Sequence, residues 1–185
     1  MTGRRARPVI VAALALAALT LAAPAGSGTN PWRSLHRPLH LPVVKPGARC
    51  PVTSAELVAP GISQAQGRGP VYPVLTWPTL SFSLLAKPQQ IWYPSEWSGQ
   101  KTLWIARPGF RGRVLIRGRE LGGINIVGFG PKRIPAGELH LQIARDRQWS
   151  SLATYTRLRA PGCYAFQIDG PTFSRVVVFR AVGTS

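Results

Sequence analysis

The clearest hydrophobic pattern in the chain lies near its C-terminus. Tyr164, Phe166 and Ile168 alternate with smaller or more polar residues, which is the period of a strand with one buried face. An Asp-Gly-Pro sequence then predicts a turn, with the Asp169 side chain capping its own backbone. Residues 173–181 return as a β-branched and aromatic run that is too apolar for a solvated edge. The pattern therefore predicts a hairpin whose two strands contribute to a sandwich core.

Similar strand signals recur upstream at spacings near ten residues, with Gly or Pro between most of them, and no helical periodicity follows residue 25. This cadence predicts an all-β fold, an antiparallel sandwich of about seven or eight strands. In residues 113–117, Val114 and Ile116 share the core face and the opposite face meets water, and His140 falls on a polar face. Residues 54–78 are rich in Gly and Pro and predict a long loop. The expected upstream strands are 80–86, 91–93, 102–107, 113–117, 124–129, 138–143 and 149–159.

The N-terminus has the three parts of a signal peptide: a basic start, an apolar stretch over 9–23, and small residues up to Ala25. We expect cleavage after Ala25 and a protein that is secreted or associated with the cell envelope. The alternative is a retained N-terminal membrane anchor, although the apolar stretch is shorter than the ~20 residues that cross a bilayer. Residues 26–49 predict a proline-rich extended arm or linker, and residues 50–185 a single β-sandwich domain.

Two cysteines, Cys50 and Cys163, remain after the predicted cleavage. An even number in an exported chain favours one disulfide, with two free buried thiols as the alternative. Such a bond would pin the start of the domain to its penultimate strand. On the chain-entropy model it would stabilise the fold by roughly 4–5 kcal/mol.

Histidines and acids give little support for a metal or for catalysis. His36 and His40 have the spacing of two ligands on one helical face, but Pro38 between them forbids that helix, so we expect no metal and no cofactor. The chain has no Gly-x-Ser-x-Gly and no His-Glu-x-x-His sequence, and its six acids are scattered singly. The sequence thus favours a protein that is not an enzyme.

The net charge of the chain says more about its function than the histidines and acids do. The full chain has a net charge of +17, and the predicted signal peptide contains three of the basic residues and no acid. If the strands that carry the arginines share a solvent face, they form a basic stripe that binds anionic groups. The alternative is a compositional charge on a solvated surface that has no partner. The candidate binding residues are Arg107, Arg111, Arg113, Arg117, Arg119, Arg157 and Arg159.

Tryptophans cluster between residues 77 and 104, where Trp77, Trp92, Trp97 and Trp104 fall within 28 residues. Exposed aromatic side chains bind sugars or stack on bases. The more ordinary interpretation is that these side chains fill the core of an all-β domain.

The C-terminal residues 160–181 resemble the final hairpin of immunoglobulin-like sandwiches in bacterial secreted proteins. With Cys50–Thr53, 69–73 and Leu115–Arg119 they resemble a set of uncharacterised exported bacterial proteins. The resemblance implies an immunoglobulin-like sandwich and no activity. Pro161 stands where that fold's antibody members have a tyrosine before the second cysteine, so we do not expect an inter-sheet disulfide.

Two hypotheses follow. The preferred one is a secreted, non-catalytic module that docks on anionic cell-wall polymers or lipid head groups, or on another envelope protein, with nucleic acid less favoured. The alternative is a secreted hydrolase whose site is built from the loops of residues 54–98. A deep cleft that brings together Glu96, His140 or another acid would favour the hydrolase, and a face of guanidinium groups would favour binding.

Overall fold

The structure is a computed structural model that describes residues 30–45, 47–58, 61–62, 64–75, 79–83, 92–144 and 146–184. The predicted signal peptide lies outside these residues, as do Trp77 and Ile91. None of the helical structure in the described part of the chain is long and apolar enough to cross a membrane.

Strands dominate the fold. The only helical element among the described residues is a single 3₁₀ turn, η1 (Arg33–Leu35). Eleven strands are described, three of which contain only two residues. They are β1 (Ala55–Glu56), β2 (Ala65–Gln66), β3 (Val71–Val74), β4 (Thr79–Ser83), β5 (Ser98–Ala106), β6 (Gly112–Glu120), β7 (Gly128–Phe129), β8 (Leu139–Ile143), β9 (Ser150–Leu158), β10 (Gly162–Gly170) and β11 (Phe173–Thr184).

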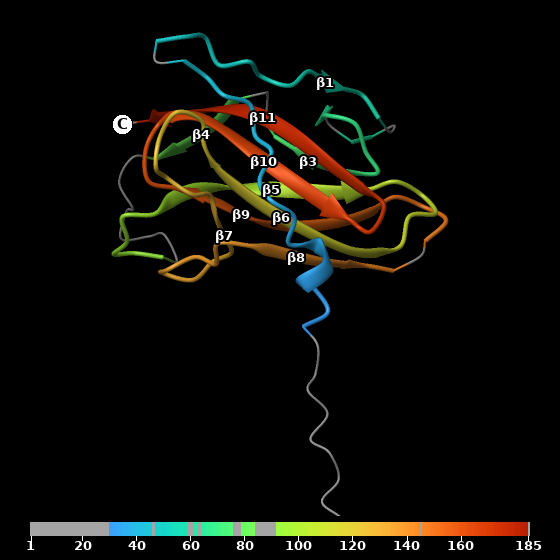
Figure 1. The fold of residues 1–185 in the computed structure, drawn as a ribbon. Helices are drawn as coiled ribbons and strands as arrows, with labels where there is room; N and C mark the ends of the chain where they lie inside the picture. Colours follow the sequence, from blue (N-terminus) through green and yellow to red (C-terminus); the bar gives the residue numbers. More distant parts are fainter. Residues whose placement is uncertain are drawn as a thin grey trace, which may run out of the picture.

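Two larger sheets and one small one result. The five-stranded sheet has the order β4-β11-β10-β6-β8 and the four-stranded sheet the order β3-β5-β9-β7, while β1 and β2 form a separate pair (Figure 1). The pairing of β4 with β11 is parallel, and the other strand pairs are antiparallel. The all-β prediction is therefore confirmed.

One hydrophobic core joins the two larger sheets. Trp104 of β5 packs edge-on against Phe166 of β10 with ring centroids 5.1 Å apart, and Phe166 stacks on Phe179 of β11 at 4.5 Å. All three side chains are buried, together with Val114 and Ile116 of β6. The alternation that marked Tyr164, Phe166 and Ile168 as a core face is thus confirmed.

The C-terminal hairpin agrees with its prediction. Gly170 pairs with Phe173 across a two-residue turn, and the ladder continues to Gly162 and Ala181. Strands predicted at 102–107, 113–117, 138–143 and 149–159 correspond to β5, β6, β8 and β9.

Other elements of the structure differ from those that the sequence predicted. Trp92 and Tyr93 lie in a loop, and the predicted strand at 124–129 is reduced to β7 with Ile126 in an isolated bridge. Within the predicted long loop, the structure has the β1–β2 pair and β3. β3 is an edge strand, which explains how it accommodates Pro73.

The proline-rich arm lies on the outer face of the five-stranded sheet. It runs from η1 across β6 and β10 before the chain reaches β1 (Figure 1). Leu35 is buried, and Leu41 and Val44 pack beside Ala165 of β10. Leu115 on the outward side of β6 is also fully buried, while Arg113 on the same side is exposed, so the expectation that this face meets water is wrong only where the arm covers it. The sequence pattern could not predict this burial because the arm residues that cover β6, such as Arg37 above Arg117, are about 80 positions away in the chain.

A disulfide fastens the end of the arm. Cys50 is bonded to Cys163 at the start of β10, with Cα atoms 5.5 Å apart and a sequence separation of 113. This confirms both the predicted bond and its attachment to the penultimate strand. It also indicates an oxidising environment for the folded chain.

Candidate functional site

The candidate arginines fall into two clusters in sequence, the first over residues 107–119 and the second over 157–159, and these clusters do not form one stripe. Arg113, Arg117 and Arg119 lie on β6 in the five-stranded sheet, whereas Arg157 lies on β9 in the four-stranded sheet and Arg159 follows that strand. The condition for a single basic stripe, that these strands share a solvent face, is therefore not met. Strand positions could be predicted from the hydrophobic pattern, but the division of the strands between two sheets could not.

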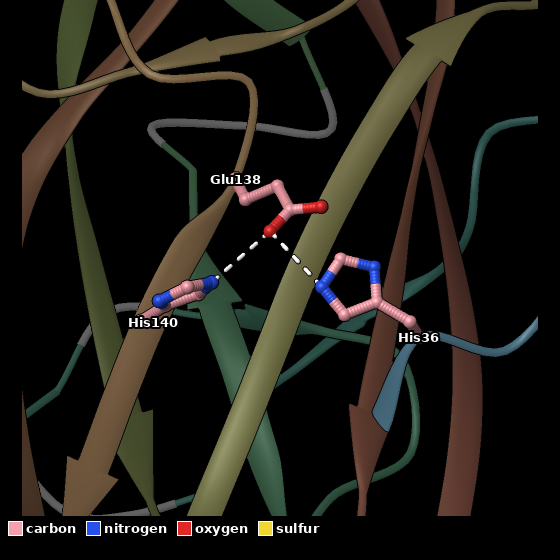
Figure 2. Close-up of side chains that lie close together, drawn as sticks. All are labelled: His36, Glu138 and His140. Carbon is pink, nitrogen blue, oxygen red and sulfur yellow. Dashed lines mark hydrogen bonds and ion pairs between the residues drawn. The ribbon is translucent and has the colours of Figure 1, made fainter. Parts of the chain in front are cut away.

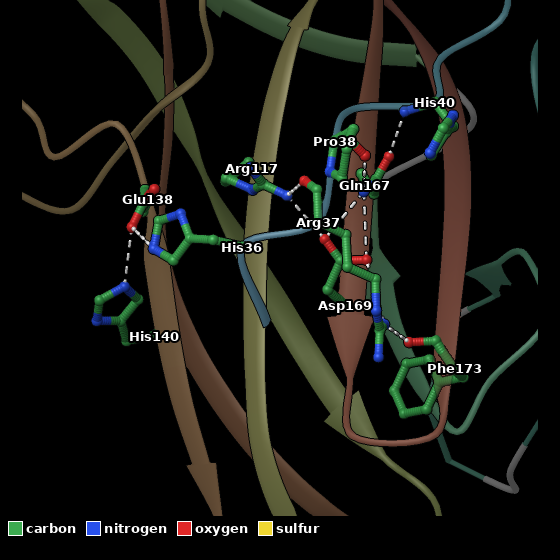
Figure 3. A network of polar contacts seen from close by, with 10 residues as sticks. All are labelled: His36, Arg37, Pro38, His40, Arg117, Glu138, His140, Gln167, Asp169 and Phe173. Atoms are coloured by element: carbon green, nitrogen blue, oxygen red, sulfur yellow. Dashed lines mark hydrogen bonds and ion pairs between the residues drawn. The ribbon is translucent and has the colours of Figure 1, made fainter. Parts of the chain in front are cut away.

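Arg117 takes part in an internal network and is only partly exposed. Its Nη2 donates to Asp169 Oδ2 at 2.9 Å and to the backbone carbonyl of Arg37 in the arm. Asp169 is fully buried in β10, and Arg37 Nη1 lies 3.5 Å from its other oxygen (Figure 3). Asp169 therefore holds the arm, and the prediction that it caps the turn is wrong.

The remaining arginines of the first cluster are exposed. Arg107 donates to the Tyr72 hydroxyl at 2.8 Å, and the Arg113 guanidinium lies 5.9 Å from the centre of the Trp32 ring. Arg111 and Arg119 are exposed as well. These four side chains remain able to meet a ligand at the surface.

Arg157 is fully buried. Its guanidinium donates to the carbonyls of Trp97, Gly130 and Lys132, the last at 2.8 Å, and its Cζ lies 4.2 Å from the centre of the Trp92 ring. Burial lowers the pKa of Arg157 to about 10, so the group is still cationic at neutral pH. Arg157 therefore connects the loop before β5 to the loop after β7 instead of facing solvent.

Between these two loops the structure has an open groove of about 900 Å³. Tyr93 and Ile134 present apolar surface there, with 51% and 78% of each residue exposed. Arg133 and Arg159 line the same groove. The arrangement offers two guanidinium groups beside an exposed aromatic ring.

Internal contacts hold the groove in shape. The Ser95 hydroxyl donates to the Arg133 carbonyl at 2.8 Å, which ties one loop to the other beside the Arg157 contacts. Arg159 stacks over Trp97 with its Cζ 4.4 Å from the ring centre and forms an ion pair with Glu96 at 2.9 Å. The groove is therefore largely preformed.

The tryptophans mostly fill the interior. Trp92, Trp97 and Trp104 are buried, which agrees with the core interpretation, although Trp97 also lines the groove where Arg159 stacks on it. Among the described residues of this region, the exposed ring is that of Tyr93, which the sequence pattern predicted to lie in a strand. In the sequence, the one signal that marks Tyr93 as a candidate is its position within the Trp-rich segment.

Another cleft of about 910 Å³ lies beside the disulfide and contains Arg49 and Arg180. Its remaining lining residues are small or aliphatic, and none of them is aromatic. It offers positive charge without a flat surface for a sugar ring.

Glu96 and His140, the two side chains named for a hydrolase site, lie in separate hollows, although His140 is paired with another acid, Glu138. Glu96 is largely exposed and paired with Arg159, and it lines the groove described above. His140 lines a separate cavity of about 420 Å³ that contains no acidic residue. The two side chains proposed as partners in a catalytic cleft therefore do not converge.

A second cluster joins the arm to β8. His36 Nε2 lies 3.4 Å from Glu138 Oε2, and His140 Nε2 lies 3.1 Å from the same oxygen (Figure 2). His40, whose spacing from His36 was rejected as a ligand pair because of Pro38, is not part of this group, and its backbone amide donates to Gln167. Sequence spacing could not reveal the cluster because His36 and His140 are far apart in the chain.

In comparisons with known proteins, no protein-family model matches this chain, and no curated protein or solved structure matches it significantly. Its function must be argued from its own residues.

Proposed function

We propose that this chain is an exported, non-catalytic binding module with an immunoglobulin-like sandwich, and that it binds an anionic cell-envelope polysaccharide in the groove beside Tyr93. The observation that carries the proposal is the groove itself, which is lined by the exposed Tyr93 ring, Arg133 and Arg159 and lies between loops that the buried Arg157 holds together.

Strand order supports the immunoglobulin-like assignment. In that fold one sheet has the order A-B-E-D and the other has G-F-C. Here β3-β5-β9-β7 corresponds to the first and β11-β10-β6 to the second, with all seven strands in the expected sequence order. β4 and β8 are additional strands at the two edges of the larger sheet.

A tyrosine contact also supports the assignment. The Tyr164 hydroxyl, near the start of the strand equivalent to F, donates to the Ala160 carbonyl at 2.8 Å, as in the tyrosine corner of many such sandwiches. Burial and the charge of Glu120 raise the pKa of this phenol, so the hydroxyl keeps its proton. The disulfide departs from the antibody pattern because it joins the arm to this strand instead of linking the two sheets.

Export is supported by the disulfide and by the N-terminal sequence pattern. The ligand class is supported by chemistry. Guanidinium groups pair with phosphate or carboxylate in a planar, two-point geometry, and the face of an aromatic ring packs against the apolar face of a sugar. The full chain has a net charge of +17, and the chain without the three arginines of the predicted signal peptide has +14, which adds long-range attraction to an anionic polymer.

The test is binding to a purified phosphate-bearing cell-wall polysaccharide at about 50 mM salt, with neutral dextran as the comparison polymer. We expect binding to the anionic polymer that weakens steeply as salt rises. Arg133→Gln and Tyr93→Ala should each weaken it about tenfold, since a charge-assisted hydrogen bond or a stacked ring contributes at least ~1.5 kcal/mol.

Arg175→Gln is the matched control because Arg175 is an exposed arginine on β11, near the opposite end of the sandwich. It should change affinity less than twofold. Equal losses for Arg175→Gln and Arg133→Gln would mean that net charge alone drives association. No binding at the lowest salt, or tighter binding to DNA or anionic vesicles, would overturn the assignment of the ligand.

A further inference from the structure

We propose that His36, Glu138 and His140 form a binding site for a divalent transition metal, Zn²⁺, which clamps the N-terminal arm onto the five-stranded sheet. This inference is independent of the polysaccharide groove.

The donor set comes from two separate parts of the fold. Glu138 and His140 are two residues apart around the start of β8 and so point to the same side of the sheet. His36 follows η1 in the arm and reaches over from the neighbouring segment (Figure 2). Together they offer two imidazole nitrogens and one carboxylate oxygen, a set that Zn²⁺ prefers and that Mg²⁺ and Ca²⁺ do not.

Distances between the donors agree with a tetrahedral ion. Zn–N and Zn–O bonds of about 2.0 Å place neighbouring ligand atoms about 3.3 Å apart on a tetrahedron. The two observed distances to Glu138 Oε2 are 3.4 Å from His36 and 3.1 Å from His140. All three donor atoms lie within 4.8 Å of one another, so only small side-chain rotations are needed to surround an ion.

Neighbouring contacts hold the histidines in place. The His140 ring stacks on Trp32 with centroids 4.3 Å apart and planes 16° apart. On either side of His36, Leu35 is buried and Arg37 donates to the Phe173 carbonyl at 2.6 Å (Figure 3). The arm is therefore fixed at this point before any ion binds, which reduces the cost of ordering the ligands.

The site is accessible to an ion from solvent. Between 32% and 39% of each of the three side chains is exposed. Three protein ligands leave a fourth position for water or for a group from a partner. Since one ligand belongs to the arm and two to β8, a bound ion would add a direct link between them and stabilise the folded chain.

The experiment measures Zn²⁺ binding by calorimetry, and the melting temperature with and without Zn²⁺, on chelator-treated protein that has no histidine tag. We expect one equivalent of Zn²⁺ to bind and the melting temperature to rise by about 5 °C at saturating metal. Glu138→Gln and His140→Ala should each lower the affinity at least tenfold and abolish the rise.

His40→Ala is the matched control. It removes another exposed histidine of the arm but leaves the backbone hydrogen bond to Gln167 intact, and it should bind Zn²⁺ like the unaltered protein. If His140→Ala fails to fold because the Trp32 stack is lost, His36→Gln provides the second ligand variant. Failure of the folded, unaltered protein to bind Zn²⁺, or equal affinity in the ligand variants, would show that the three side chains form only a hydrogen-bonded group.

Discussion

Arg157 shows how a single buried cation shapes the candidate site without touching a ligand. Its fork of donors reaches carbonyls on two loops, while its planar face lies on Trp92. The desolvation cost of burying a guanidinium is offset because these contacts satisfy several of its donors. The sequence presented Arg157 and Arg159 as equivalent members of one cluster, and only burial separates their roles.

The variant Arg157→Lys tests the role of this side chain. A lysine ammonium lacks the planar fork needed to reach all the carbonyls, so we expect the free energy of unfolding to fall by about 3 kcal/mol. Urea denaturation measures this change. Arg159→Lys is the control, and should cost less than about 1 kcal/mol because its ion pair with Glu96 is exposed. Similar losses in the two variants would contradict the bridging role of Arg157.

At the scale of elements, the arm explains why β10 is buried on both faces. Gln167 and Asp169 point outward from β10, yet both are fully buried. Gln167 donates to the Pro38 carbonyl at 3.0 Å and accepts from the His40 amide at 2.7 Å (Figure 3). Because prolines prevent the arm from forming a regular ladder, side chains of the sheet provide its hydrogen bonds.

Asp169→Asn tests this attachment. Loss of the charge leaves Arg117 and Arg37 without their shared carboxylate, and we expect destabilisation by about 2–3 kcal/mol. Hydrogen exchange of the His40 amide should quicken more than exchange in the β10–β11 ladder. Asp146→Asn removes the same charge from an exposed acid and should affect neither quantity. Unchanged exchange at His40 in Asp169→Asn would show that the arm is held by other contacts.

The elements also show where prediction from sequence succeeds. Regular alternation identified β6, β8 and β10 because each has one face in the shared core, and the spacing of strand signals identified β9. It failed for Trp92 and Tyr93, whose aromatic residues resemble a strand but form a loop tied to Arg157. The polar contacts of the arm could not be predicted from the sequence for a different reason. The contacts of His36 with His140, and of Arg37 with Asp169, join residues more than a hundred positions apart.

For the whole molecule, the disulfide closes a loop that contains most of the fold. It holds the C-terminal end of the arm, while Arg37 and Leu35 hold its beginning. Repulsion between like charges also destabilises a small, strongly basic domain in its folded state. A covalent link that restricts the unfolded chain acts in the opposite direction.

The double variant Cys50→Ser/Cys163→Ser measures that contribution. A loop with 113 residues of separation implies a loss of about 4 kcal/mol, which corresponds to a fall in melting temperature of roughly 10 °C. Dithiothreitol should lower the melting temperature of the unaltered protein to that of the double variant and leave the variant itself unchanged. Thermal unfolding exposes the disulfide to the reductant. If dithiothreitol still does not change the melting temperature of the unaltered protein, the two cysteines are not bonded in solution. The bond acts on the unfolded ensemble as well as on the arm, so its loss should lower global stability more than Asp169→Asn does.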